Sequence, residues 1–129
     1  MSGKYAVGTE KIMRGQIDLV TDSLQVYLCD STYYTPNLGT DESLSQLPES
    51  SIIAESSLDG KAIIGTSLQA NSTVFTNPTS DRNADLLVIC LANITYDNSW
   101  LLAVIDFDPI LTNGEPCTVE WENSLVMGY

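Results

Sequence analysis

The sequence predicts an all-β domain, an antiparallel β-sandwich or flattened barrel with a short N-terminal helical turn. Three observations predict it: short apolar segments of strand length, turn-forming residues between them, and little helical periodicity. A chain of 129 residues that is 43% hydrophobic can bury one core. We expect residues 1–14 to form an arm with the helical turn, residues 15–122 to form the sandwich, and residues 123–129 to form a C-terminal arm or a last strand.

The first two elements are predicted near the N-terminus. Thr9 is a suitable cap for a helical turn over residues 10–14, and Gly15 is suited to end it in a left-handed conformation. Residues 23–29 predict a strand, because three aliphatic side chains alternate there with other residues at the two-residue period of a half-buried strand.

The middle of the chain predicts a loop and then a hairpin. Residues 30–48 are rich in Ser, Thr, Asp, Pro and Gly, so we expect a long loop with at most one turn of helix at residues 41–47. Residues 51–58 and 61–65 are expected to pair, because the Asp-Gly dipeptide between them suits a tight type I′ turn. Residues 72–75 predict another short strand.

The last third of the chain predicts three strands. Residues 85–92 form an apolar run without alternation, which is typical of a central strand buried on both faces. Residues 100–107 are expected to pair with it in antiparallel fashion and to stop at Pro109. The Asn113-Gly114 dipeptide marks a turn before an alternating strand at residues 118–122, whose tryptophan is expected in the core.

Composition narrows the function classes. Seventeen acidic residues against five basic ones give a net charge of -12, which repels phosphate groups and anionic lipids, so neither nucleic acid nor membrane is an expected partner. The start of the chain lacks the apolar run of a secretion signal, which favours synthesis in a cytosol. Three widely spaced cysteines without histidine indicate reduced thiols rather than a disulfide framework or a zinc site.

Catalysis and metal binding have weak support in the sequence. The chain has no histidine and none of the common nucleophile or phosphate-binding motifs, so we expect no enzyme and no cofactor. The carboxylate pairs Asp106/Asp108 and Glu120/Glu122 lie about 7 Å apart if strand-borne, as a glycosidase requires, but alternating acids also solvate ordinary strand faces. A calcium site formed by acids of the long loop remains an alternative, although their spacing matches no EF-hand: Asp30, Asp41 and Glu42.

Candidate partner-binding residues lie in the long loop and at both ends of the chain. Two adjacent tyrosines beside a proline in a polar loop are expected to be exposed and to contact a partner. Apolar residues at the two ends either close the protein's own sheet or pack on a neighbouring copy. The candidates are Tyr5, Ile12, Met13, Tyr33, Tyr34, Pro36, Leu125, Val126, Met127 and Tyr129.

Six short segments follow one another in a characteristic order: GQIDL at 15–19, TDSLQVYL at 21–28, DSTYYTP at 30–36, LDGK at 58–61, LLAVID at 101–106, and Asn113-Gly114 before Val119-Glu120-Trp121. In content and order they resemble a loosely defined family of small structural proteins of tailed bacteriophages. The likeness spans most of residues 15–122. The sequence departs from the family at residues 77–82, where a glycine-rich stretch is common.

The resemblance implies a virion protein without enzymatic activity, most specifically a capsid cement or decoration protein with a β-sandwich fold. Its implied partners are the major capsid protein and copies of itself, as a homotrimer on the capsid surface after synthesis in the host cytoplasm. The acid excess suits an outer surface better than one that faces packaged DNA. A tail or neck component, or a receptor- or glycan-binding module, is the alternative.

Overall fold

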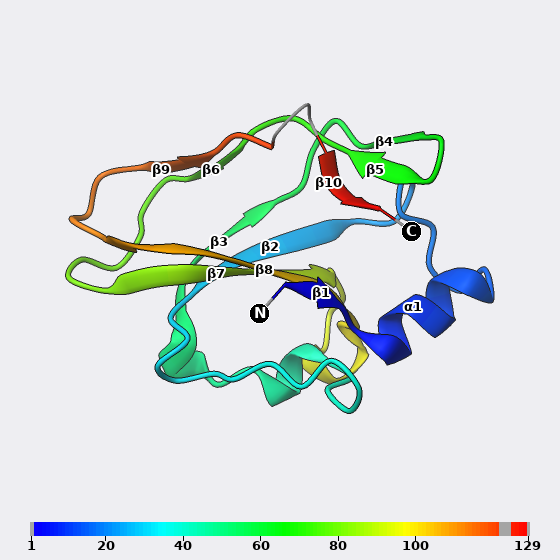
Figure 1. Ribbon diagram of the computed structural model, residues 1–129, viewed down its shortest axis with the longest axis horizontal. Helices are drawn as coiled ribbons and strands as arrows, with labels where there is room; N and C mark the ends of the chain where they lie inside the picture. Colours follow the sequence, from blue (N-terminus) through cyan, green and yellow to red (C-terminus); the bar gives the residue numbers. More distant parts are fainter. Residues whose placement is uncertain (1, 122–124, 129) are drawn as a thin grey trace.

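The computed structural model describes residues 2–121 and the backbone of residues 125–128, and it confirms the antiparallel all-β class (Figure 1). Helix α1 spans Ala6–Met13, and three single-turn 3-10 helices span Leu44–Gln46 (η1), Glu49–Ser51 (η2) and Tyr96–Asn98 (η3). The strands are β1 (Gly3–Lys4), β2 (Leu24–Cys29), β3 (Ile52–Ser57), β4 (Ala62–Ile64), β5 (Ser67–Gln69), β6 (Thr73–Phe75), β7 (Asn83–Leu91), β8 (Leu101–Leu111), β9 (Cys117–Val119) and β10 (Leu125–Gly128).

A five-stranded sheet with the order β1-β8-β7-β2-β3 forms the centre of the molecule. Strand β7 pairs with β2 on one side and with β8 on the other, all antiparallel, as the apolar run at residues 85–92 predicts. Its side chains point alternately to two different clusters, because both faces of the sheet are covered: Leu87 and Ile89 face one cluster, and Leu86 and Val88 face the other.

The first cluster is the sandwich core, which lies between the central sheet and two smaller sheets, β10-β5-β4 and β6-β9. Figure 1 shows these smaller sheets above the central one. The strand pairings leave open edges, so the fold is a sandwich and not a closed barrel. The buried core includes Leu24, Val26, Leu28, Leu58, Leu68, Phe75, Leu102 and the predicted Trp121.

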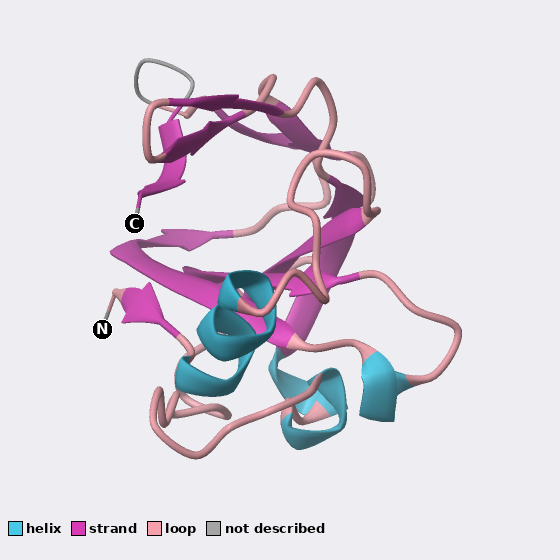
Figure 2. Ribbon diagram, turned by 90° about the vertical axis from the view of Figure 1, so that its right-hand side faces the viewer, coloured by secondary structure: helices cyan, strands magenta, loops and turns pink. Residues whose placement is uncertain are grey.

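The opposite face of the central sheet is covered by the long segment between β2 and β3. Figure 1 shows this segment, coloured from cyan to green, beneath the central sheet, and Figure 2 shows loops and short helices covering that side of the sheet. Tyr27 and Cys29 are buried on this face, so the prediction that β2 is only half-buried is wrong, because the long segment covers its second face. The second cluster includes Tyr5, Tyr27, Cys29, Tyr34, Leu44, Leu47, Val88, Cys90 and Leu101.

Helix α1 begins earlier than the sequence predicts. It starts at Ala6 after an extended Tyr5, so Thr9 lies within the helix and is not its cap. Gly15 follows the helix with a φ of +73°, as expected for a residue that ends a helix. The buried Gly8 allows the helix to pack directly against the backbone of β8, and this packing fixes the position of the helix.

The predicted hairpin between residues 51–58 and 61–65 is wrong. Strand β3 pairs with β2 instead, and β4 pairs with β5 through a turn at Gly65, whose φ is +63°. Gly60 does adopt a positive φ of +65°, so the Asp-Gly dipeptide turns the chain but carries it from the central sheet to a smaller one. Pairing with β2 lets the apolar side chains of β3 pack against the central sheet, whereas an isolated two-stranded hairpin is marginally stable.

Pro109 does not end its strand, contrary to the prediction. Strand β8 continues to Leu111, and the register against β7 shifts between Leu86 and Ala84. This irregularity places extra β8 residues opposite a shorter stretch of β7, so Pro109 needs no ladder hydrogen bond there. Among the described residues, no helix is long and apolar enough to cross a membrane.

Candidate docking surfaces

The two adjacent tyrosines of the long loop have different environments. Tyr33 is 53% exposed, as predicted, whereas Tyr34 is only 6% exposed and belongs to the second apolar cluster. Pro36 is buried as well. The expectation that all three are exposed is therefore wrong for Tyr34 and Pro36, because the loop folds back over the central sheet instead of projecting from it.

Tyr33 contacts Arg82, the residue directly before β7. The guanidinium carbon of Arg82 lies 5.4 Å from the centroid of the Tyr33 ring, and Arg82 Nη2 donates a hydrogen bond of 2.5 Å to the carbonyl oxygen of Ser50. Arg82 Nη2 also lies 3.8 Å from Asp30 Oδ2. An exposed cation–π contact contributes about 0.5–1 kcal/mol. Tyr33 is thus an exposed aromatic side chain with a restrained position.

Two of the three acids considered for calcium binding, Asp30 and Asp41, already have protein partners. Asp30 contacts Arg82 and accepts a 2.9 Å hydrogen bond from the backbone N–H of Thr32. Asp41 accepts hydrogen bonds from the Tyr34 hydroxyl and from the backbone N–H of Asn37. Within the described residues, no group of three or more metal-ligating side chains comes together.

The N-terminal candidates also separate. Tyr5 is fully buried, which corrects its assignment as a partner contact, because its ring fills the space beneath the central sheet. Ile12 is half-buried and packs against the sandwich core. Met13 is 81% exposed at the end of α1. Of these three residues, Met13 is the one whose side chain is free to enter another molecule.

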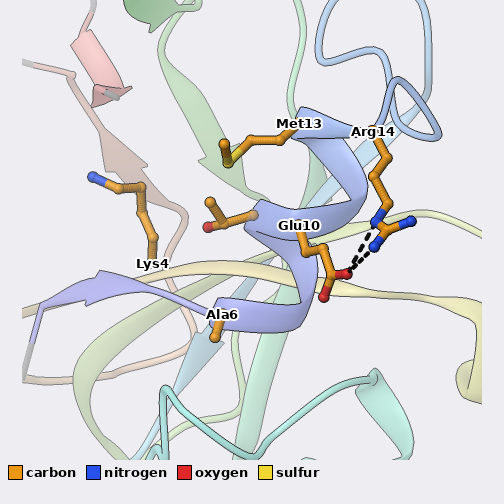
Figure 3. Close-up of a pocket in the computed structure, with 6 residues that line it drawn as sticks. Lys4, Ala6, Glu10, Met13 and Arg14 are labelled. Atoms are coloured by element: carbon orange, nitrogen blue, oxygen red, sulfur yellow. Dashed lines mark hydrogen bonds and ion pairs between the residues drawn. The ribbon is translucent and has the colours of Figure 1, made fainter.

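Met13 borders a shallow groove along α1 (Figure 3). Ala6 and Met13 give the groove an apolar wall, and Lys4 lies across from the helix. Glu10 and Arg14 form an exposed ion pair with a separation of 2.9 Å, drawn as dashed lines in Figure 3. Such an exposed pair adds little stability, so Arg14 can exchange its partner at low cost.

The C-terminal candidates belong to a strand or fall outside the description. Leu125, Val126 and Met127 lie on β10, which pairs with β5 and so extends one of the smaller sheets. Their side chains lie outside the described part of the structure, as does Tyr129. For the backbone, closure of the protein's own sheet is the alternative that the structure confirms.

A groove between β8 and β9 was not predicted from the sequence. It is lined mostly by apolar side chains, and Trp121, at 9% exposure, is its most deeply buried aromatic. The Trp121 indole Nε1 donates a 3.3 Å hydrogen bond to Thr73 Oγ1, which orients the ring. The other principal lining residues are Ile105, Phe107, Ile110, Val119 and Glu120.

The acids of β8 alternate with the residues that line this groove, so their side chains point to the opposite face of the strand. Asp106 and Asp108 are both exposed, and Asp106 Oδ1 accepts a 2.5 Å hydrogen bond from the Ser2 hydroxyl. The sequence signal for the groove is the alternation of half-buried Ile105 and Phe107 with these acids. The same pattern describes an ordinary solvated strand, so the sequence alone does not identify a groove.

No family model, no curated protein and no solved structure matches the chain.

Proposed function

We propose that this chain is a structural protein that acts by binding other protein subunits, most specifically as a cement or decoration protein of a tailed-bacteriophage capsid. The observation that carries the proposal is Tyr33, an exposed aromatic side chain held against Arg82 on a firmly packed sandwich. Tyrosines are enriched at binding hot spots, and a restrained side chain loses little conformational freedom on binding. Such an anchor favours docking on a preformed protein surface.

The cement role is supported by the resemblance over residues 15–122 and by the sandwich fold expected from it. The net charge of -12 favours a position on the outer capsid surface, away from packaged DNA. The expected partners are the major capsid protein and copies of the chain, which would cover the joints between capsid subunits.

A capsid-binding assay tests this proposal. Purified capsids that lack the chain are mixed with the wild-type protein, and the bound fraction is measured by co-sedimentation over a range of concentrations. Replacement of Tyr33 by Ala is expected to weaken binding by about tenfold or more, as for an interface hot spot. Tyr96→Ala is the matched control, because Tyr96 is 48% exposed but lies on η3.

Two outcomes contradict the proposal. One is a wild-type protein that fails to sediment with capsids. The other is equal binding by the Tyr33→Ala and Tyr96→Ala variants, which would remove Tyr33 from the contact.

Glycan recognition is the second candidate, favoured by the same exposed Tyr33 ring, since sugar rings stack on aromatic faces. Glycan-array binding that disappears in Tyr33→Ala, together with no binding to capsids, would favour a tail-borne recognition module.

A further inference from the structure

Charge is distributed very unevenly along the chain. Three cations and one anion give residues 1–14 a net charge of +2, whereas two cations and sixteen anions give residues 15–129 a net charge of -14. The positive segment contains β1 and α1, which include three of the five basic residues of the chain: Lys4, Lys11 and Arg14. The molecule therefore has a basic region on an otherwise acidic surface.

An exposed apolar side chain lies within the basic region. Met13 is 81% exposed, and it adjoins Arg14 at the end of α1 and faces the groove that Lys4 also lines. Gly8 packs closely against the carbonyl oxygen of Leu101, and with the helix in this orientation Met13 is on its exposed side. Met13 is a flexible apolar side chain of the kind that fits irregular apolar grooves.

The groove between β8 and β9 has the complementary chemistry. Phe107, Val119 and Trp121 give it an apolar lining, and Glu120 lines it beside them. Outside the basic region, Lys61 bonds the carbonyl oxygen of Asp22 and Arg82 bonds that of Ser50. Within it, Lys11 lies over the Trp100 ring and Arg14 pairs with Glu10.

The two complementary surfaces lie apart on the same molecule. Figure 1 shows α1 at one end of the long axis, and β9 with the last residues of β8 towards the other end. A single copy therefore cannot join them. Two copies can, and the contact leaves one helix and one groove unoccupied for further copies.

We infer that copies of this chain associate head to tail, with Met13 and the basic end of α1 from one copy bound in the apolar groove between β8 and β9 of the next, where Arg14 meets Glu120. A contact between two different patches relates each copy to the next by the same rotation. If repeating this rotation returns to the first copy, a closed ring forms; otherwise an open filament forms. This contact would supply the self-association that the proposed function includes. Only its biological purpose rests on that proposed function, because the contact forms in solution without a capsid.

The test is light scattering coupled to size-exclusion chromatography on the full chain over a range of concentrations. We expect a concentration-dependent oligomer whose dissociation constant rises when the NaCl concentration is raised, because salt screens the pairing of exposed charges. Arg14→Glu and Glu120→Lys are each expected to raise the dissociation constant by about tenfold or more, because each places like charges in contact.

Mixing the two variants distinguishes this contact from other modes of association. The Arg14→Glu protein keeps an intact groove and the Glu120→Lys protein keeps an intact helix, so each supplies what the other lacks. An equimolar mixture is therefore expected to recover association, and so is the double variant with both charges exchanged. A twofold-symmetric contact through one of the patches would not be restored in the mixture.

Two further variants separate the apolar contact from general effects. Met13→Ala is expected to weaken association, whereas Ile94→Ala is not, although Ile94 is 98% exposed. Asp97→Lys makes the same charge change as Glu120→Lys at an exposed position on η3 and is expected to leave association unchanged. Circular dichroism and thermal unfolding confirm that each variant is folded.

A wild-type chain that stays monomeric at all concentrations overturns the inference. So does an oligomer whose dissociation constant is the same in Arg14→Glu, Glu120→Lys and Asp97→Lys. This experiment contains no capsid. Failure of the head-to-tail contact here and failure of capsid binding in the co-sedimentation assay are therefore separate results.

Discussion

The hydroxyl groups of Tyr5 and Tyr34 lie 2.8 Å apart beneath the central sheet. The Tyr34 hydroxyl also lies 2.8 Å from Asp41 Oδ2. An ionised carboxylate only accepts hydrogen bonds, so Tyr34 donates to Asp41 and Tyr5 donates to Tyr34. This chain of hydrogen bonds links the N-terminal segment to the loop between β2 and β3, and it explains why Tyr34 is buried.

Replacing Tyr34 by Phe is expected to lower the free energy of unfolding by about 1–3 kcal/mol, because the buried Tyr5 hydroxyl loses its acceptor and Asp41 loses a donor. Tyr5→Phe is expected to cost less, since Tyr34 still donates to Asp41. Urea unfolding measures both changes. Tyr33→Phe is the matched control, with an expected change within about 0.5 kcal/mol, as at other exposed sites. A loss in Tyr34→Phe no larger than in this control would contradict the network.

Alkaline pH is expected to destabilise the fold. Burial raises the pKa values of Tyr5, Tyr27 and Tyr34 above their ordinary value of 10.0. The stability that depends on these neutral hydroxyls is fully present below the pKa of the unfolded state, and it is lost as the pH rises towards the raised pKa of the folded state. The free energy of unfolding, measured from about pH 8 to about pH 11, is expected to fall above about pH 10. A flat profile would contradict this burial.

The three cysteines are expected to differ in reactivity. Burial raises the pKa of both Cys29 and Cys90 to about 12, and both side chains are enclosed beneath the sheet. Cys117 is only half-buried on β9. Mass spectrometry after iodoacetamide treatment of the folded protein is therefore expected to find the label on Cys117 first, and on all three cysteines in urea. Early labelling of Cys29 would contradict its enclosure, because it would show that the segment covering the second apolar cluster opens.

The contact between α1 and β8 predicts a large effect of a small substitution. A Cβ atom at Gly8 would lie 2.1 Å from the Leu101 carbonyl oxygen, so the helix would have to move. Alanine improves helix propensity by about 1 kcal/mol, but displacement of packed backbone outweighs this, and we expect Gly8→Ala to destabilise by about 1–3 kcal/mol or more.

Gly39→Ala provides the comparison for this prediction. The atom nearest to a Cβ at Gly39 is Asn37 Oδ1 at 3.7 Å, and thermal unfolding should show almost no change. If Gly8→Ala were as stable as Gly39→Ala, the helix would not be held against the strand as described.

The sequence predicts the elements whose burial is visible in a local pattern. The alternation over residues 23–29 and the continuous apolar run at residues 85–92 locate β2 and β7, although the alternation does not reveal that the second face of β2 is also buried. The turn at Asn113-Gly114 is also present, with a φ of +83° at Gly114. Each of these signals lies within a few residues of the feature that it predicts.

The sequence predictions are wrong where strand pairing or side-chain burial depends on residues far away in the sequence. The pairing of β3 with β2 depends on a strand more than twenty residues earlier in the chain, which the local turn signal at Asp59-Gly60 does not reveal. Tyr34 is buried by Tyr5, which lies 29 residues away in the sequence. The groove between β8 and β9 exists because two different sheets end side by side, which no single strand pattern records.

The most direct test of the central proposal, that the chain docks on other subunits of a virus particle, is the number of its copies in purified particles of a tailed bacteriophage whose genome encodes this sequence. Quantitative mass spectrometry measures this number relative to the major capsid protein. The capsid cement role predicts a fixed ratio near that of the capsid subunits. A few copies per particle would instead indicate a neck or tail component, and absence from the purified particle would contradict the account.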